Sequence, residues 1–184
     1  MIPDTVFCNL FISLSLSRTS KTESVWVTAL ALRALHEISK TWTHLVYVDP
    51  QVTDKALRFI LGHQGGHGAW WEPGGSVGDR NLLPAQYWLS ADSTHSLNLS
   101  LSAHTVLSLA ALHDLPSPLD AAVDAAVRRG ARWLEENLNV VGEVSRALEV
   151  SVVALALHVA ESPLARMAFD ILTRNAHQES KDVC

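Results

Sequence analysis

Three stretches of the chain are apolar on nearly every face, and each is followed by a stretch with one apolar and one polar face. The apolar stretches span residues 23–38, 99–115 and 147–160. A helix that is apolar all round is typical of one surrounded by other helices, whereas a helix with a polar face lies at a surface. The pattern therefore predicts helices in the order inner, outer, inner, outer, inner, outer.

Each predicted outer helix begins at an Asp-Pro or Ser-Pro pair. The pairs start at residues 49, 117 and 162. The first residue of such a pair can cap a helix, and proline suits the first helical position because its missing N–H costs nothing there. The first inner helix is predicted to start differently, at a Ser-x-x-Glu capping box formed by Ser20 and Glu23.

The second outer helix shows its two faces clearly. Charged residues recur every four positions and are predicted to face solvent, opposite an apolar side. The charged residues are Asp120, Asp124, Arg128 and Arg132, and the apolar side comprises Val123, Ala126, Val127, Gly130 and Leu134.

The helical hairpin thus occurs three times along the chain. No window from Ser20 onward alternates convincingly with a period of two, and residues 44–49 form only a brief strand candidate. We predict an all-α fold over residues 20–178, with residues 1–19 outside it and residues 179–184 as a tail.

The spacing of the hairpins is uneven because residues 64–98 form a long insertion, rich in Gly, Pro, Asn, Asp and Ser, after the first hairpin. The insertion opens with Gln64, Gly68 and Trp70. An amide side chain can satisfy carbonyl groups at a helix end, glycine permits a chain reversal, and an aromatic ring can cover a helix edge. These residues are predicted to build the turn that follows the first hairpin.

Composition narrows the class of protein. A chain of 184 residues with 48% hydrophobic and 18% charged residues is long enough and apolar enough for one globular domain. The net charge of −5, without a run of lysine and arginine, argues against nucleic acid as a partner. The apolar residues 6–16 are too short and too serine-rich to span a bilayer, and they follow no basic region typical of a signal peptide.

The spacing of Gln64, Gly68 and Trp70 resembles the Gln-x-x-x-Gly-x-Trp/Phe signature of α/α toroids. Terpene cyclases, protein prenyltransferase β subunits and the thioester domains of complement and α2-macroglobulin proteins share this signature. Across residues 20–178 the order of segments is similar to that of the thioester-containing α2-macroglobulin and complement family. "GAWWEPG" and "SVGDRN" resemble its arthropod, macroglobulin-complement-related branch. The matching segments include "SVWVTALALRAL", "YVDPQVTDKALRFILGHQGGHGAWWEPG", "LSAHTVLSLAAL", "GARWLEENL" and "VSVVALALHVAESPLA".

The resemblance implies a fold and a setting. The family's toroid has six concentric helical hairpins, so three hairpins imply a partial toroid, the C-terminal half. Such a half-ring is expected to expose inner-helix surface that the remaining half of the toroid covers. Its implied parent is a secreted protein of innate immunity and protease trapping. The implied partners are the other half of the toroid, neighbouring macroglobulin-type domains and, through the parent protein, proteases or cell surfaces.

The chemistry of the family's reactive centre is not found in the sequence. That centre is a Gly-Cys-Gly-Glu-Gln thioester, and neither Cys8 nor Cys184 stands in this context. Where some relatives carry a histidine that directs acyl transfer, the corresponding position falls near Asp79 or Arg80, which cannot act as the same acyl carrier. The expectation is a domain without catalytic residues, cofactor or enzyme activity.

Two alternatives remain. A terpene-cyclase-like or prenyltransferase-like enzyme is favoured by Gln64, Gly68 and Trp70 alone; the sequence has no Asp-x-Asp-Asp motif and no cysteine between residues 9 and 183. A stand-alone α-helical interaction module is the other alternative, although uneven hairpin spacing and the lack of polar capping helices argue against it.

The histidines do not suggest a metal site. His63 and His67 are four residues apart, but Gly65 and Gly66 break any helix that would align them, and no acidic or cysteine ligand has zinc-site spacing. His104 and His158 lie inside predicted inner helices, where a hydrogen-bonded core histidine is expected.

The insertion also carries candidate surface residues. Tryptophan is enriched at protein interfaces, so the loop is a candidate interaction site, although such aromatics also pack beneath loops. Asn98-Leu99-Ser100 is a candidate N-glycosylation site, expected just before an inner helix. The candidate interaction residues are Trp71, Asp79, Arg80 and Trp88.

Overall fold

The computed structural model describes residues 23–42, 47–72, 94–112, 115, 118–139 and 147–182. This part of the chain contains no strand, only an isolated antiparallel bridge between Gln64 and Trp70. The all-α prediction is therefore confirmed. The main helices are α2 (Val25–Thr41), α3 (Pro50–Gly62), α4 (Thr94–Ala110), α5 (Leu119–Glu136), α7 (Ala147–Val159) and α8 (Ala165–Asp182).

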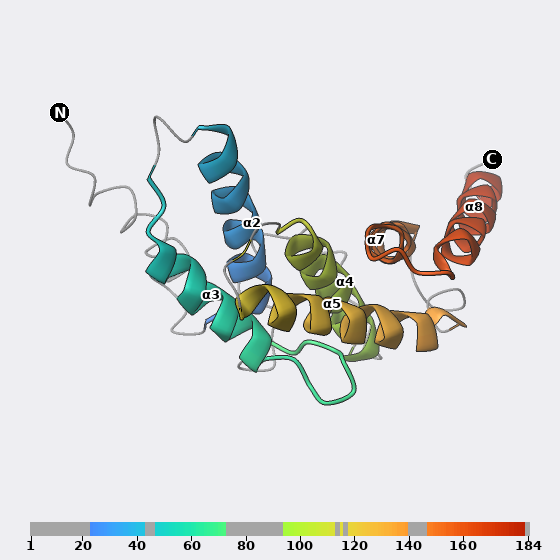
Figure 1. Ribbon diagram of the computed structural model, residues 1–184. Helices are drawn as coiled ribbons and strands as arrows, with labels where there is room; N and C mark the ends of the chain where they lie inside the picture. The colour runs from blue at the N-terminus through green and yellow to red at the C-terminus, as the bar shows by residue number, and fades with distance from the viewer. Residues whose placement is uncertain are drawn as a thin grey trace.

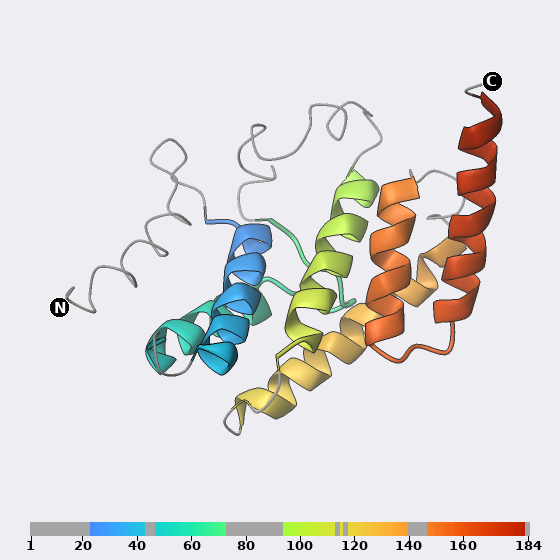
Figure 2. The same cartoon turned by 90° about the horizontal axis from the view of Figure 1, so that it is seen from above.

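The helices form three hairpins in two layers. The inner helices α2, α4 and α7 stand side by side and run in the same direction (Figure 2). In the outer layer α3 packs on α2, α5 crosses α4, and α8 packs on α7 (Figure 1). This arrangement confirms the predicted order of inner and outer helices.

The core follows α4, which packs against α2, α5 and α7. Val106 and Leu109 of this helix are completely buried. Three hydroxyl residues of α4 are buried as well, and Thr105 donates its hydroxyl to the Leu101 carbonyl oxygen at 2.8 Å. Because small hydroxyl side chains can bond to their own helix, a serine-rich helix can be enclosed by its neighbours.

The outer helices start largely as the Asp-Pro and Ser-Pro pairs predict. The Asp49 carboxylate accepts from the Gln51 N–H at 2.9 Å, and Pro50 is the first residue of α3. The Ser162 hydroxyl accepts from the Leu164 N–H at 3.1 Å just before α8. At α5 the prediction is off by one residue, because Pro118 occupies the capping position and supplies no side-chain bond.

The predicted start of the first inner helix is wrong. α2 begins at Val25 and is capped by Ser24, whose hydroxyl accepts from the Val27 N–H at 3.2 Å, whereas Ser20 lies outside the described residues. Glu23 is thus one residue before the cap instead of at the third helical position. A carboxylate from a distant loop supplies the other acceptors, which a local sequence pattern does not reveal.

Two further boundaries differ from the sequence prediction. α4 begins at Thr94, five residues earlier than expected, so the insertion is shorter than residues 64–98. α8 continues through Asp182, beyond the end at residue 178 expected for the fold. The strand candidate at residues 44–49 is described only over residues 47–49, which form no strand.

The charged stripe of α5 faces solvent as predicted, since its four charged residues are all exposed. On the opposite side four of the five apolar residues are buried and Val127 is half-buried. The sequence pattern therefore oriented this helix correctly.

The two inner helices at the ends of the row expose apolar side chains. On α7 the exposed fractions are 49% for Leu148, 47% for Leu155 and 41% for Val159, and on α2 Leu30 is 52% exposed. The three α7 residues are spaced by seven and four positions, so they share one face of the helix. The described part of α4, which has an inner helix on each side, exposes no large apolar side chain.

Candidate functional site

The turn after α3 is held by the side chain of Gln64. Its amide nitrogen donates to the carbonyl oxygen of Gly68 at 3.0 Å and to that of Ala126 on α5 at 2.9 Å. Its amide oxygen accepts from the Arg129 guanidinium at 2.6 Å. The glutamine therefore ties the turn to the middle of α5, instead of satisfying carbonyl groups at a helix end as the sequence suggested.

Gly68 allows the turn to press against α5. Its φ of +105° lies in the region that favours glycine, and a Cβ at this position would be 2.4 Å from the Arg129 carbonyl oxygen. The Gly65 N–H donates to the Ala69 carbonyl at 2.8 Å and closes the turn. A side chain at Gly68 would be excluded both by backbone conformation and by contact with α5.

Trp70 is completely buried between α3, α4 and α5, so it forms part of the core and does more than cover a helix edge. Its indole N–H donates to the Ile60 carbonyl at 2.9 Å, and its backbone N–H donates to the Ser102 hydroxyl at 3.0 Å. A Cβ on Gly130 of α5 would be 2.5 Å from the indole ring, so the ring and this glycine fit closely together.

Glu72 links the same loop to the start of α2. Its carboxylate accepts from the Val25 N–H at 2.8 Å, the Trp26 N–H at 2.9 Å and the Ser24 hydroxyl at 3.1 Å. The side chain is buried, and a carboxylate at a helix N-terminus satisfies free N–H groups and interacts favourably with the helix dipole. Glu72 is therefore a distant cap of α2.

Residues 63–72 thus form a clamp that joins α2, α3, α4 and α5. The side chains of Gln64 and Glu72 are hydrogen-bonded to backbone or to neighbouring side chains, and the ring of Trp70 is enclosed. This arrangement fixes the helices relative to one another; His67 is exposed on its surface and contacts Trp133, with 6.3 Å between the ring centroids.

Trp71 is the one residue of the candidate interaction loop that the structure describes. It is 49% exposed, and its ring lies 4.7 Å from that of His63, which in turn lies 4.3 Å from Phe59. The His63 Nδ1 is 2.7 Å from the Phe59 carbonyl oxygen. Asp79, Arg80 and Trp88 lie outside the described residues.

Asn98 lies within α4, not just before it as expected. The structure describes the backbone of Asn98 but not its side chain, so the glycosylation site stays a prediction.

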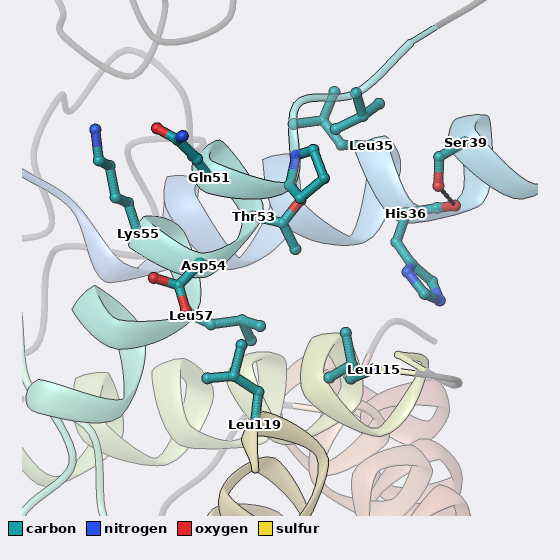
Figure 3. Close-up of a pocket in the computed structure, with 12 residues that line it drawn as sticks. Leu35, His36, Ser39, Gln51, Thr53, Asp54, Lys55, Leu57, Leu115 and Leu119 are labelled. Atoms are coloured by element: carbon teal, nitrogen blue, oxygen red, sulfur yellow. Dashed lines mark hydrogen bonds between the residues drawn. The ribbon is translucent and has the colours of Figure 1, made fainter. Parts of the chain in front are cut away.

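A cavity of about 620 Å³ lies between α2, α3 and the residues that lead into α5 (Figure 3). Leu57, Leu115 and Leu119 line its apolar side, and the Asp54 carboxylate on its rim is paired with Arg58 at 2.8 Å. The hydrogen bond from Arg58 lowers the pKa of Asp54. The Ser39 hydroxyl donates to the His36 carbonyl at 2.8 Å and is not directed at the imidazole, so the cavity presents no serine–histidine pair.

The histidines take different positions. His63 and His67 belong to the clamp and its surface, and within the described residues no group of three or more potential metal ligands comes together. His158 is exposed on α7, so the expectation of a core histidine is wrong there; it contacts Phe169 with 6.0 Å between ring centroids. None of the described helices is long and apolar enough to cross a membrane.

Three helical hairpins in an inner and an outer layer define a partial α/α toroid. The family model described as the A-macroglobulin TED domain, the thioester-containing domain, matches residues 10–184. The chain therefore belongs to the A-macroglobulin TED domain family, the domain of complement- and macroglobulin-like thioester-containing proteins. No curated protein matches the chain.

Membership in this family confirms the resemblance inferred from the sequence. Domains of this family act as scaffolds or covalent-binding domains, and the family is generally extracellular. The boundary at residue 20 stays a prediction.

Sequence reasoning identified Gln64, Gly68 and Trp70 but missed Glu72 and Arg129. These two residues act on elements 46 to 65 positions away in the sequence. A single sequence carries no signal for such pairs; the one local sign is that Glu72 directly follows two tryptophans in a glycine-rich turn.

Proposed function

We propose that this chain is a non-catalytic scaffold and interaction part of the thioester domain in a secreted macroglobulin- or complement-type protein. In this proposal other parts of the domain pack on the exposed face of α7. The parent protein acts in innate immunity by trapping proteases or by binding surfaces, and neighbouring macroglobulin-type domains contact the outer helices and the loop after the clamp.

The face formed by Leu148, Leu155 and Val159 carries the proposal. Apolar side chains at one face of a helix normally pack against another element, and these three are 41% to 49% exposed. Their helix is the last inner helix of the described row, where a further inner helix of a toroid would lie.

The non-catalytic part of the proposal rests on the sequence and on the clamp. Cys8 and Cys184 are the only cysteines, and neither lies in Gly-Cys-Gly-Glu-Gln. The motif residues Gln64, Gly68 and Trp70 are used to join helices. Trp71 belongs to the clamp but is half-exposed, and it is the described residue that we assign to the interaction surface, together with Asp79, Arg80 and Trp88 of the loop.

The substitution Leu155→Glu tests whether a partner covers α7. In the 184-residue chain we expect little change in the free energy of unfolding, within about 0.5 kcal/mol, because the position is half-exposed. In the product of the full-length transcript the same change would bury a carboxylate and cost at least about 2 kcal/mol. Urea denaturation of both proteins measures the difference.

Arg132→Glu is the matched control in the 184-residue chain, where Arg132 lies on the exposed stripe of α5 and its substitution should be neutral. A neutral Leu155→Glu in the longer protein would refute the covered face and favour a stand-alone interaction module. The same refutation follows if the transcript encodes no residues beyond this chain.

Protease trapping belongs to the parent protein and is tested separately. The full-length secreted product is incubated with trypsin, and the complex is analysed by gel filtration for protease that remains active towards small substrates. If neither trypsin nor a second protease of different specificity is retained, trapping is contradicted and surface binding is left as the role of the parent protein.

A further inference from the structure

His104 lies in the middle of α4 at its contact with α2. Its imidazole stacks on the indole of Trp26, with ring centroids 4.0 Å apart and an angle of 14° between the planes. The residue is half-buried, and the stack joins two neighbouring inner helices. Ring stacking of this kind is one of the direct side-chain contacts that hold α2 against α4.

No hydrogen-bond acceptor is paired with the Nε2 atom of the imidazole, where a second proton would be added. Its Nε2 is buried and has no hydrogen-bond partner, and the Ser108 hydroxyl, one turn further along α4, is also buried without a partner. A protonated ring has N–H donors at both nitrogens, so Nε2–H would be left unpaired in the helix contact. A cation–π interaction with the indole face would stabilise the protonated ring by about 0.5–2 kcal/mol, which is less than the free-energy cost of burying an unpaired charge.

The surroundings of the ring also favour its neutral form. Burial lowers the pKa of His104 from 6.5 to about 4; a hydrogen bond with the Trp26 backbone opposes this effect, and the positive charge of Arg33 adds to it. Glu72 lies near the stack, but its carboxylate already accepts three hydrogen bonds at the start of α2. The other ionisable side chains on the helices packed against α4 are His36, Glu37 and Lys40 on α2, Glu149 and His158 on α7, and Asp120, Asp124, Arg128, Arg129, Arg132, Glu135 and Glu136 on α5.

We propose that the stack of His104 on Trp26 is an acid-sensitive contact, and that protonation of the imidazole loosens α2 from α4. The neutral ring fits the contact, whereas the charged ring requires water or an acceptor at Nε2. Movement of α2 away from α4 supplies that water. Glu72 of the clamp is hydrogen-bonded to the start of α2, so movement of this helix also strains or breaks the hydrogen bonds of Glu72.

The sign of the pH dependence follows from the two protonation states. The unfolded chain takes up a proton at His104 below its ordinary pKa of 6.5, whereas the folded chain does so only near 4. Stability is therefore lost as the pH falls from about 6.5 towards 4. Between pH 7.5 and 5.0 the expected loss in the folding equilibrium constant from this residue is up to about 30-fold, an upper value because the ring is partly exposed.

Urea unfolding of the full 184-residue chain at pH 7.5 and pH 5.0 tests the proposal. His104→Gln keeps a neutral polar side chain, so its folding equilibrium should lose up to about 30-fold less than that of the wild type over this interval. His158→Gln, on the exposed part of α7, is the matched control and should lose as much as the wild type. Equal pH dependence in wild type and His104→Gln would overturn the proposal.

Two measurements on the wild type keep the test decisive if His104→Gln does not fold. In NMR titrations of the imidazole groups, one histidine should titrate well below the others. Its ring protons should show contacts to the protons of an indole ring, as the stack of His104 on Trp26 requires. Hydrogen exchange at pH 5.0, corrected for intrinsic rates, should accelerate in α2 more than in α8. A set of histidines that all titrate near pH 6.5, or equal acceleration in both helices, contradicts an acid-sensitive contact at this place.

Discussion

At the scale of single residues, two adjacent tryptophans play opposite parts. Trp70 is completely buried and bonded to Ile60, whereas Trp71 is 49% exposed. Trp70→Ala should lower the free energy of unfolding by about 3–5 kcal/mol, because it removes a large core ring and leaves a cavity beside Gly130. Trp71→Ala should cost about 1 kcal/mol or less.

Urea denaturation of the two variants checks this contrast, and their equal loss of stability would contradict the assignment of Trp70 to the core. The sequence motif singled out Gln64, Gly68 and Trp70, and a positive φ at Gly68 agrees with the reason for choosing glycine. It did not reveal that Gln64 bonds to Ala126 on α5, because that contact depends on how the hairpins pack.

At the scale of elements, local signals predicted helix starts only where the cap is local. Asp49 caps α3 two residues ahead of its donor, so the Asp-Pro pair was sufficient. α2 depends on Ser24 together with Glu72, which comes from a loop 48 residues away from Ser24, and the capping box at Ser20 and Glu23 was wrong for that reason. Periodicity, by contrast, oriented α5 correctly because each face repeats along the whole helix.

The distant cap of α2 leads to a prediction about the whole helix. Glu72→Gln keeps the shape of the side chain but places an NH₂ group where one oxygen now faces backbone N–H donors. We expect a loss of about 1–3 kcal/mol, because a buried donor is left unpaired and the charge at the helix N-terminus is removed.

Thermal unfolding followed by circular dichroism measures this loss, with Glu136→Gln at the exposed end of α5 as the control that should be neutral. A Glu72→Gln variant as stable as the control would mean that water or Ser24 alone satisfies the N-terminus of α2.

At the scale of the whole molecule, the two layers were predictable from the sequence because inner and outer helices differ in how many faces are apolar. The sequence did not predict which helices pack against one another, because periodicity shows which face of a helix is buried but not which helix covers that face. α4 shows the consequence: its pattern predicts burial, and only the structure shows that it packs against α2, α5 and α7 at once. His158 illustrates the limit, because α7 is apolar all round yet has no inner helix beyond it in the described part of the chain.

This unequal packing predicts the order in which the molecule opens. α4 is enclosed by three helices, whereas α8 packs mainly on α7, so native-state hydrogen exchange should show the highest protection in α4 and lower protection in α8. Leu109→Ala on α4 should lower protection in every helix by about 2–5 kcal/mol, since it removes a fully buried side chain from the shared core. Ile171→Ala, at a buried position of α8, should lower protection in that helix and spare α2 and α3. If Ile171→Ala instead reduces protection equally in all helices, the three hairpins unfold as one cooperative unit and the last hairpin is not the first to open.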